Sequence, residues 1–284
     1  MIGPDRLSRV TAGAVVPEQV VDYVRAVSGA RPRLLGDCVA YASGESLVLV
    51  GYPLRDPRDA AAMAAAVDQA LALPEVRRLT VIGPARPPQA PPHSVVAEDG
   101  YGALPVPAPA PGAKLRNLLR RAGRELTLVR GRRLDEAHTA LVERYIAERR
   151  LPPGTRHIFR QIPRYLEASA GAQVASAMRA DGRLAAFAVG EFAALATAFF
   201  MFCFRDPATA PPGSADLVLS GLLEEARDRG QTLMNMGLGV SEGIRFFKRK
   251  WGAEPFLPYV ETRWEPRPAG LLSALRRFVA GDGP

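Results

Sequence analysis

Residues 213–259 have the sequence GSADLVLSGLLEEARDRGQTLMNMGLGVSEGIRFFKRKWGAEPFLPY, which is the clearest structural pattern in this chain of 284 residues. Its first part, residues 215–229, predicts a helix that ends at Gly230, because glycine commonly follows the last helical residue. An apolar strand is expected over 232–237 and a second helix over 241–251. The order helix, strand, helix is typical of an α/β fold.

Helices and strands alternate in the rest of the chain as well. The Pro/Gly-rich stretch at 85–112 has little pattern and is typical of a linker. The sequence therefore predicts an N-terminal half over 1–84 and a larger C-terminal domain over 113–284, both α/β (α+β) with mixed sheets flanked by helices. The other expected elements are helices at 17–27, 56–73 (with an Asp cap), 113–125, 134–149, 156–168 and 269–280, a hairpin at 34–54, and strands at 77–83, 172–179, 183–191, 195–204 and 254–264.

The composition indicates a cytoplasmic protein. The apolar run at 184–204 approaches the length of a membrane span, but Gly190 and Glu191 interrupt it. Two adjacent buried strands explain the run better, since central strands are continuously apolar. Cys38 and Cys203 lie far apart and have no metal-ligand spacing with the three histidines, so no metal site or disulfide is predicted. The N-terminus has no signal-peptide pattern.

Lysine and asparagine are rare, and their positions are informative. The lysines are Lys114, Lys248 and Lys250, and the asparagines are Asn117 and Asn235. They fall into two short segments, one directly after the expected linker and one within the stretch quoted above. A composition rich in Ala, Arg, Gly and Pro suggests a coding bias against both residue types. We therefore expect the exceptions to be needed where they occur, and chance clustering is the alternative.

Positive charge is concentrated in the second half of the chain, and most densely at residues 113–133, which include the expected helix 113–125. On that helix Arg116, Arg120 and Arg124 are four residues apart and share a face. Such a face attracts polyanions such as RNA, an anionic membrane surface or a phosphorylated cofactor. The alternative is a face that is simply solvated.

The end of the expected strand 232–237 carries residues that are suited to a ligand-binding site. Asn235 lies at that end, and Gly237 and Gly239 permit a tight turn and a close backbone approach to a ligand. Ser241 can cap the next helix, and Glu242 is favourable in its first turn.

Lys248 borders the apolar face of that next helix. Ile244, Phe247 and Trp251 share one face in a helical projection, and Lys248 lies at its edge. A lysine in this position can bring a positive charge into a cleft. The alternative is a packed aliphatic stem whose charged head stays in water.

No motif for a nucleophilic triad or a zinc protease is present. Acyl transfer without a covalent intermediate requires positioning of the substrates, deprotonation of the acceptor and stabilisation of an oxyanion. Asn235, Lys248 and Tyr259 are candidate donors for this chemistry, and Glu242 or Asp216 is a candidate base.

The loop before helix 215–229 is poorly suited to a coenzyme A diphosphate. Diphosphate sites at helix N-termini usually contain several glycines, whereas here Gly213 alone follows two prolines. Asp216, in the first turn, is favourable for the helix dipole but unfavourable for a bound diphosphate.

Three segments resemble the tandem acetyltransferase-like proteins of the GNAT fold. The resemblance includes the catalytic domain of phosphatidylglycerol lysyltransferases and, more distantly, the Fem-type peptidoglycan aminoacyltransferases. The most specific segment is residues 213–259, with a strand that ends near Asn-x-Gly and a helix that carries Phe-Lys before a Gly. KLRNLLRRAGRELTLV at 114–129 resembles the Arg-rich helix after the interdomain crossover. GDCVAYASGESLVLVGYPLRDP at 36–57 is similar to the hairpin of the first repeat.

The resemblance implies two such folds in tandem, with the active cleft in the second. It also implies transfer of an aminoacyl group from charged tRNA, or of an acyl group from a thioester, to an amine or a hydroxyl. Lys248 and the Arg-rich helix would contact the donor, and Asn235 and Gly237 would line the acceptor channel. The substrate- and donor-binding residues expected in all are Lys248, Gly237, Gly239, Lys114, Asn117, Arg120 and Arg124.

Three functions are therefore compatible with the sequence. The first is a GNAT-type acyltransferase or aminoacyltransferase that uses aminoacyl-tRNA or acyl-CoA as a co-substrate, with no tightly bound cofactor and no DNA partner. The second is an acyl-CoA-dependent N-acetyltransferase that acts on a small molecule or a peptide. The third is a non-catalytic module that binds RNA or an anionic surface. The expected location is the cytoplasm, with peripheral contact to the anionic inner membrane surface as an option.

Overall fold

The computed structural model describes residues 4–266, which form a mixed α/β structure that divides into two compact units. The first unit contains residues 30–98 and 258–266, and the second contains residues 4–29 and 99–257. The helices are α1 Pro4–Ala12, α2 Val21–Ser28, α3 Ala60–Ala72, α4 Ala113–Glu125, α5 Glu136–Glu148, α6 Pro153–Arg160, α7 Ile162–Ala168, α8 Ser214–Asp228 and α9 Glu242–Lys250, with 3-10 helices η1 Pro17–Gln19 and η2 Pro92–Ser94. The strands are β1 Arg31–Leu35, β2 Cys38–Ser43, β3 Ser46–Val50, β4 Arg78–Gly83, β5 Val95–Pro105, β6 Leu126–Gly131, β7 Ala172–Arg179, β8 Leu184–Glu191, β9 Thr197–Arg205, β10 Leu233–Leu238 and β11 Glu254–Trp264.

These units differ from the domains expected over 1–84 and 113–284. The stretch 85–112, expected to be a linker, contains β5, which begins in the first unit and ends in the second. β11 begins in the second unit and ends in the first. Strand pairing is the physical reason, because β5 pairs with β10 of the second unit and β11 pairs with β4 of the first. The expected helix at 269–280 lies outside the described residues.

The first unit is a mixed sheet with the strand order β1-β2-β3-β4-β11. β1, β2 and β3 form antiparallel pairs, β3 and β4 run parallel, and β11 is antiparallel to β4. Helix α3 packs its alanine-rich face on this sheet, against buried residues that include Leu49 and Leu79. Asp59 caps α3, as its Oδ1 accepts the N–H of Ala62 at 2.9 Å, which agrees with the expected Asp cap.

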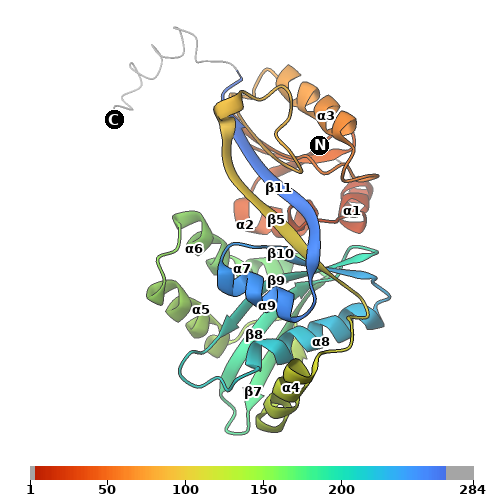
Figure 1. Ribbon diagram of the computed structural model, residues 1–284. Coiled ribbons are helices and arrows are strands. Elements are labelled where there is room, and N and C mark those ends of the chain that lie inside the picture. The colour runs from red at the N-terminus through yellow and green to blue at the C-terminus, as the bar shows by residue number, and fades with distance from the viewer. Residues whose placement is uncertain (1–3, 267–284) are drawn as a thin grey trace, which may run out of the picture. The chain divides into compact units, whose positions relative to one another are not determined.

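The second unit has the strand order β5-β10-β9-β8-β7-β6. Helices α4 and α8 pack on one face of this sheet, and α2, α5 and α7 pack on the other (Figure 1). Side chains of β8 alternate between the two cores: Ala186 and Ala188 face α8, whereas Phe187 and Val189 face α5 and α7. Because both faces are covered, every residue of β8 is buried. The apolar run at 184–204 therefore forms two adjacent strands, β8 and most of β9, as expected.

The two central strands β9 and β10 separate at the middle of this sheet. They pair in parallel from Thr197 to Phe199 of β9, and the pairing ends at Phe199 and Asn235. Just beyond that point β9 has a bulge at Met201, where its register with β8 shifts. Bulges redirect a strand and are common beside active sites. Beyond Phe199, β9 and β10 are therefore no longer paired with each other.

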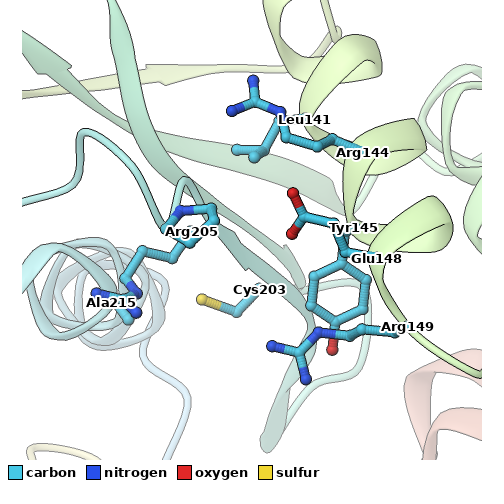
Figure 2. A pocket seen from close by; sticks show the side chains of 9 residues that line it. Leu141, Arg144, Tyr145, Glu148, Arg149, Cys203, Arg205 and Ala215 are labelled. Carbon is cyan, nitrogen blue, oxygen red and sulfur yellow. The ribbon is translucent and has the colours of Figure 1, made fainter.

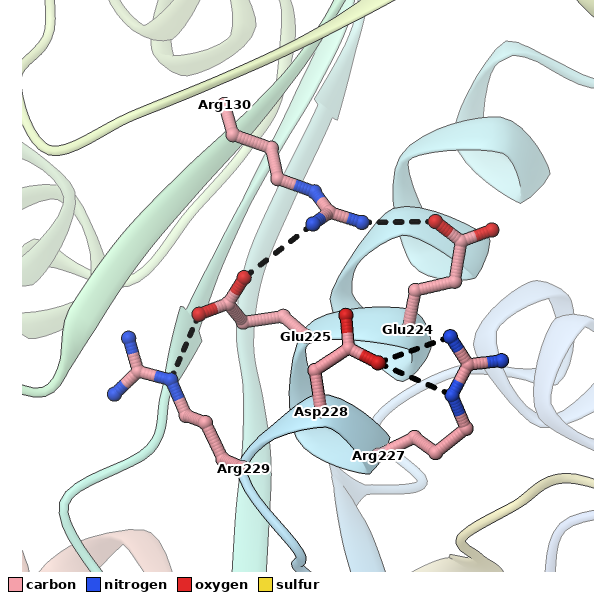
Figure 3. Close-up of polar contacts among 6 residues, drawn as sticks. All are labelled: Arg130, Glu224, Glu225, Arg227, Asp228 and Arg229. Carbon is pink, nitrogen blue, oxygen red and sulfur yellow. Dashed lines mark hydrogen bonds and ion pairs between the residues drawn. The ribbon is translucent and has the colours of Figure 1, made fainter.

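Helix α8 lies unusually close to β6. A Cβ at Gly221 of α8 would be 2.5 Å from a methyl carbon of Leu128 in β6, so a larger residue there would require the Leu128 side chain to move. At the next turn Arg130 of β6 reaches Glu224 at 2.8 Å and Glu225 at 3.5 Å (Figure 3). Exposed ion pairs of this kind contribute little stability each. The buried apolar residues of α8, which include Leu219 and Leu222, are therefore what holds it on the sheet.

Glu191 is a fully buried carboxylate at the end of β8. Its Oε2 accepts the hydroxyls of Tyr165 at 2.7 Å and Ser169 at 2.6 Å, and its Oε1 accepts the N–H of Phe192 at 3.0 Å and Ala193 at 2.9 Å. Burying a charge is costly unless hydrogen bonds satisfy it. Four donors do so here, and together they fix α7 to the loop after β8.

The structure confirms the predicted α/β fold class with mixed sheets and flanking helices. Residues 113–125, 172–179 and 254–264 form the expected elements with the expected bounds. β1 and β6 were not expected, and the helix expected over 156–168 is two helices, α6 and α7. No helix among residues 4–266 is long and apolar enough to cross a membrane.

Candidate functional site

A tight turn joins β10 to α9, and Asp99 of β5 holds it. Asp99 Oδ1 accepts the N–H of Gly239 at 3.2 Å, and Oδ2 accepts the N–H of Val240 at 2.8 Å. Gly239 is required, because a Cβ there would lie 2.7 Å from Asp99 Oδ1. Among the described residues, Val240 is the only non-glycine with a positive φ, at 41°. Such backbone strain persists where the surroundings enforce it, and it is concentrated at functional sites.

Lys248 of α9 brings a buried positive charge to this turn. The residue is 7% exposed, and its Nζ donates to the carbonyl oxygens of Gly237 at 2.6 Å and Leu238 at 2.5 Å. Burial lowers the pKa of Lys248 to about 8, although the negative charge of Asp99 opposes this shift. The head group is therefore not held in water, and its protonation changes near physiological pH.

A pocket of about 540 Å³ opens beside Lys248. Residues 99–102 of β5 and residues 252–255 after α9 form most of its wall, and Arg245 and Arg249 of α9 complete it. Its volume is within the usual range for ligand sites. A buried lysine, a strained turn and a ligand-sized pocket thus meet at one place.

Asn235 and Gly237 shape this place from β10. Asn235 is fully buried; its Nδ2 donates to the carbonyl of Val15 at 2.8 Å, and its Oδ1 accepts the N–H of Gly237 at 2.8 Å. Gly237 has φ 74°, and a Cβ there would be 4.0 Å from Lys248 Nζ. Both polar atoms of the Asn235 amide are engaged within the protein, so Asn235 positions the turn that receives Lys248.

Asp216 and Lys250 form a second buried contact, between α8 and α9. Lys250 Nζ lies 2.6 Å from Asp216 Oδ1, which also accepts the indole N–H of Trp251 at 2.8 Å. Burial, together with the nearby Asp216, raises the pKa of the Cys203 thiol to about 12. The Asp216 carboxylate is therefore an anchor for α9, and Cys203 is a neutral thiol at physiological pH.

Glu242 and Tyr259 lie outside the wall of the Lys248 pocket. Glu242 follows Ser241, whose Oγ accepts the N–H of Ile244 and caps α9 as expected. Hydrogen bonds from Arg249 and Arg245 lower the pKa of the Glu242 carboxyl, which makes it a weaker base. Tyr259 belongs to the first unit, and its hydroxyl donates to Glu261 at 3.0 Å.

The Arg-rich helix α4 presents its charges to solvent. Lys114, Asn117, Arg120 and Arg124 are all exposed, and Arg120 donates to Asn117 at 3.1 Å. Lys114 and Arg124 make no ion pair or side-chain hydrogen bond with any described residue. None of the four lines the pocket beside Lys248, so the structure does not bring the two groups of rare residues into one cleft.

Helix α4 also covers the start of α8. Gly213, with φ 92°, precedes α8, and a Cβ there would lie 2.9 Å from the carbonyl oxygen of Leu118 and 3.2 Å from Cβ of Ala122, both in α4. Ser214 and Asp216, in the first turn of α8, are buried. A diphosphate bound at a helix N-terminus needs access to the free N–H groups there. Packing of α4 covers Gly213, and within this first turn the half-buried Ala215 stays accessible and lines another pocket.

Asp135, His138 and Ser176 have the connectivity of a catalytic triad. His138 Nδ1 is 2.6 Å from Asp135 Oδ1, and its Nε2 is 2.8 Å from Ser176 Oγ. His138 and Ser176 are both 6% exposed, and neither belongs to the wall of the Lys248 pocket. The group therefore caps α5 and joins it to β7, because a substrate cannot reach the buried hydroxyl.

Asp99 was not predicted from the sequence. It is separated by 140 residues from Gly239, whose N–H it accepts, and it lies in a segment with no amphipathic pattern. Asp99 follows a proline-rich stretch, and nothing in the neighbouring sequence indicates that it holds the turn between β10 and α9. Only the pairing of β5 with β10 brings it to the site.

Comparisons with known proteins agree with this geometry. Residues 113–249 match the acetyltransferase (GNAT) domain family. FemX has a TM-score of 0.61 at 11% identity, over 92% of this chain and 96% of its own. For L-PGS from Bacillus licheniformis the TM-score is 0.55 at 15% identity, over 99% and 98%. For a tandem GNAT protein from the clavulanic acid biosynthesis pathway it is 0.52 at 14% identity, over 93% and 94%.

At such low identities these likenesses show the fold alone, and they do so over nearly the whole chain. No curated protein matches the sequence at a significant level. The predicted resemblance to tandem GNAT-fold proteins is confirmed. Residues 113–249 thus match the acetyltransferase (GNAT) domain family, and the chain has a fold similar to that of tandem GNAT proteins.

Proposed function

We propose that this protein is a GNAT-type transferase that moves an aminoacyl group from charged tRNA to an amine or hydroxyl acceptor at the Lys248 pocket. The observation that supports this most directly is the buried ammonium of Lys248 beside a ligand-sized pocket. The GNAT match supports acyl transfer in general. The aminoacyl donor is the more specific part of the proposal.

Lys248 can stabilise the negative charge that develops on an acyl oxygen. Its ammonium has three N–H donors, and the carbonyls of Gly237 and Leu238 accept two of them. One donor is left for the oxygen of the scissile ester. In the reaction the acceptor attacks the carbonyl carbon, the bond to the ribose oxygen breaks, and the proton of the acceptor ends on the ribose hydroxyl. A preorganised donor in a site that excludes water is effective in such a step.

Two features favour a tRNA donor over a coenzyme A thioester. The packing of α4 against Gly213 covers one side of the start of α8, and Asp216 in the first turn is a buried carboxylate that is paired with Lys250. A diphosphate therefore has little access to the N–H groups of that turn. The exposed basic residues of α4, by contrast, suit a polyanion such as the tRNA backbone.

The direct test is a comparison of donors. Bulk tRNA charged with labelled amino acids is incubated with the protein and either a soluble metabolite extract or a polar lipid extract. We expect label to leave the tRNA and enter one of the extracts, and we expect no transfer from labelled acetyl-CoA or longer acyl-CoA. Transfer from acyl-CoA alone would instead establish a CoA-dependent N-acyltransferase. Binding of tRNA without any transfer would indicate a non-catalytic RNA-binding module.

The contribution of α4 is tested with a matched pair of variants. Arg116→Gln combined with Arg124→Gln is expected to weaken tRNA binding and to reduce the slope of log K against log salt by roughly 0.7–0.9 for each phosphate that is no longer neutralised. Arg31→Gln combined with Arg55→Gln removes the same charge from exposed positions of the first unit. Equal losses of affinity in the two pairs would mean that α4 has no specific role.

The pH dependence of transfer is expected to report Lys248. Its pKa of about 8 means that the ammonium is present below this pH and is lost as the pH rises through it. In Lys248→Arg the guanidinium stays charged throughout. The ratio of kcat/KM for wild type to that for Lys248→Arg should fall about tenfold from pH 7 to pH 9. Taking the ratio cancels the ionisation of the acceptor, and a constant ratio would contradict a role for the ammonium.

A further inference from the structure

A second pocket, of about 220 Å³, lies between α5 and the end of β9. Arg144 of α5 and Arg149, directly after that helix, line one side, and Arg205 of β9 and Ala215 in the first turn of α8 line the other; Cys203 lies between them (Figure 2). The pocket shares no lining residue with the one beside Lys248. It lies on the part of β9 beyond the point where the pairing with β10 ends.

Two of the three guanidinium groups are available to a ligand. Arg149 stacks over the ring of Tyr145 at 4.4 Å, which holds the guanidinium in place while its N–H groups remain in the plane of the group. Arg205 makes no ion pair or side-chain hydrogen bond with any described residue. Arg144 is partly satisfied, because its Nη1 donates to Asp206 at 3.0 Å.

The charge balance of the pocket favours an anion with a single charge. The positive groups are Arg144, Arg149 and Arg205, and the carboxylates are Glu148 in the wall and Asp206 behind Arg144. Three positive charges less two negative charges leave one positive charge. The thiol of Cys203 adds none, because burial raises its pKa to about 12.

The shape of the donors and the size of the pocket specify the ligand further. Guanidinium groups bind carboxylates and phosphates through paired N–H donors. Ligand pockets for whole small molecules usually have about 300–1,000 Å³, so this pocket accommodates only part of a molecule. We propose that it binds the singly charged end group of a larger ligand, a carboxylate or a phosphodiester.

The position of the pocket indicates what that ligand is for. A Cβ built at Gly237 is 3.9 Å from the carbonyl oxygen of Phe200 and 4.0 Å from Lys248 Nζ. Cys203 lies three residues further along β9 than Phe200, about 10 Å along a strand. An end group held in the pocket therefore belongs to a molecule that can extend along β9 toward Lys248. The identification of this molecule as a transfer substrate rests on the proposed function, whereas binding of the anion does not.

The test uses two probes with the two candidate end groups, N-acetylglycine and dimethyl phosphate. Each is titrated into 15N-labelled protein at low ionic strength, and the backbone amide resonances are followed. We expect at least one probe to give saturable shifts around residues 203–206. In Arg149→Gln combined with Arg205→Gln, the Kd should rise roughly fivefold or more, the effect of losing about 1 kcal/mol. In Arg31→Gln combined with Arg55→Gln, the Kd should not change.

The outcomes distinguish two questions: whether the pocket binds anions, and whether the bound anion belongs to a transfer substrate. Absence of saturation with both probes, or equal binding by the two variant pairs, would overturn the anion pocket. The probe that binds should also inhibit aminoacyl transfer in the wild type. Binding with intact transfer would overturn the assignment to a substrate and leave the pocket itself supported. If no donor supports transfer at all, the NMR result still decides whether the pocket binds anions.

Discussion

Replacing Lys248 with methionine should lower the rate of aminoacyl transfer by about 10²–10³-fold, the usual effect of removing one preorganised donor from a site that stabilises an oxyanion. Methionine keeps much of the length and apolar volume of the lysine stem and removes the ammonium. The carbonyls of Gly237 and Leu238 lose a donor, which costs stability, but the buried charge also disappears. We therefore expect the variant to fold, with its loss mainly in kcat.

Lys250→Met is the matched control, since it is the same change two residues along α9. It removes the ion pair with Asp216, so its stability should fall while most of its kcat is retained. Single-turnover transfer from charged tRNA measures both rates, and thermal unfolding measures both stabilities. An equal loss of kcat in the two variants would show that Lys248 acts only by holding α9 in place.

Glu191→Ala should reduce the free energy of unfolding of the second unit by about 3–5 kcal/mol, because it leaves four buried donors without their acceptor and creates a cavity. Tyr165 and Ser169 would each keep a buried hydroxyl with no partner at this position. Tyr165→Phe removes only one of the four hydrogen bonds. Its expected cost is about 1 kcal/mol.

The chain provides a direct reporter for this measurement. Trp251 lies in the second unit and Trp264 in the first. In a Trp264→Phe background, the fluorescence of Trp251 in a urea titration therefore follows the second unit alone. A loss below about 1 kcal/mol for Glu191→Ala would mean that the buried carboxylate is not satisfied by the four donors described above.

The parts of the fold that were predictable are those with a strong local pattern. The continuous apolar run at 184–204 identified β8 and β9 directly. β5 was missed because it contains Gly100, Gly102 and Pro105, and strand pairing rather than local propensity makes it a strand. The predicted domain boundaries differ from those of the two units for the same reason, because the unit boundaries depend on which strands β5 and β11 pair with.

The candidate site was predictable to the extent that it lies in one segment. Asn235, Gly237, Gly239 and Lys248 all belong to the β10–α9 region, so their proximity follows from a turn and a helix. Asp99 was not accessible in this way, because it comes from a distant strand. The roles expected of Glu242, Tyr259 and Asp216 as base or donor stay predictions, and each of their carboxylate or hydroxyl groups already has a partner in the fold.

The position of Asp99 in β5 determines how much of this chain must be inherited together if the site is to be preserved. The stretch that matches the GNAT family begins at residue 113, yet the turn at Lys248 is held by Asp99 and is joined to the N-terminal segment through Asn235 and Val15. A recombination event that carried only 113–249 to a new gene would leave both supports behind. The smallest segment that preserves the site is therefore longer than the segment that matches the GNAT family.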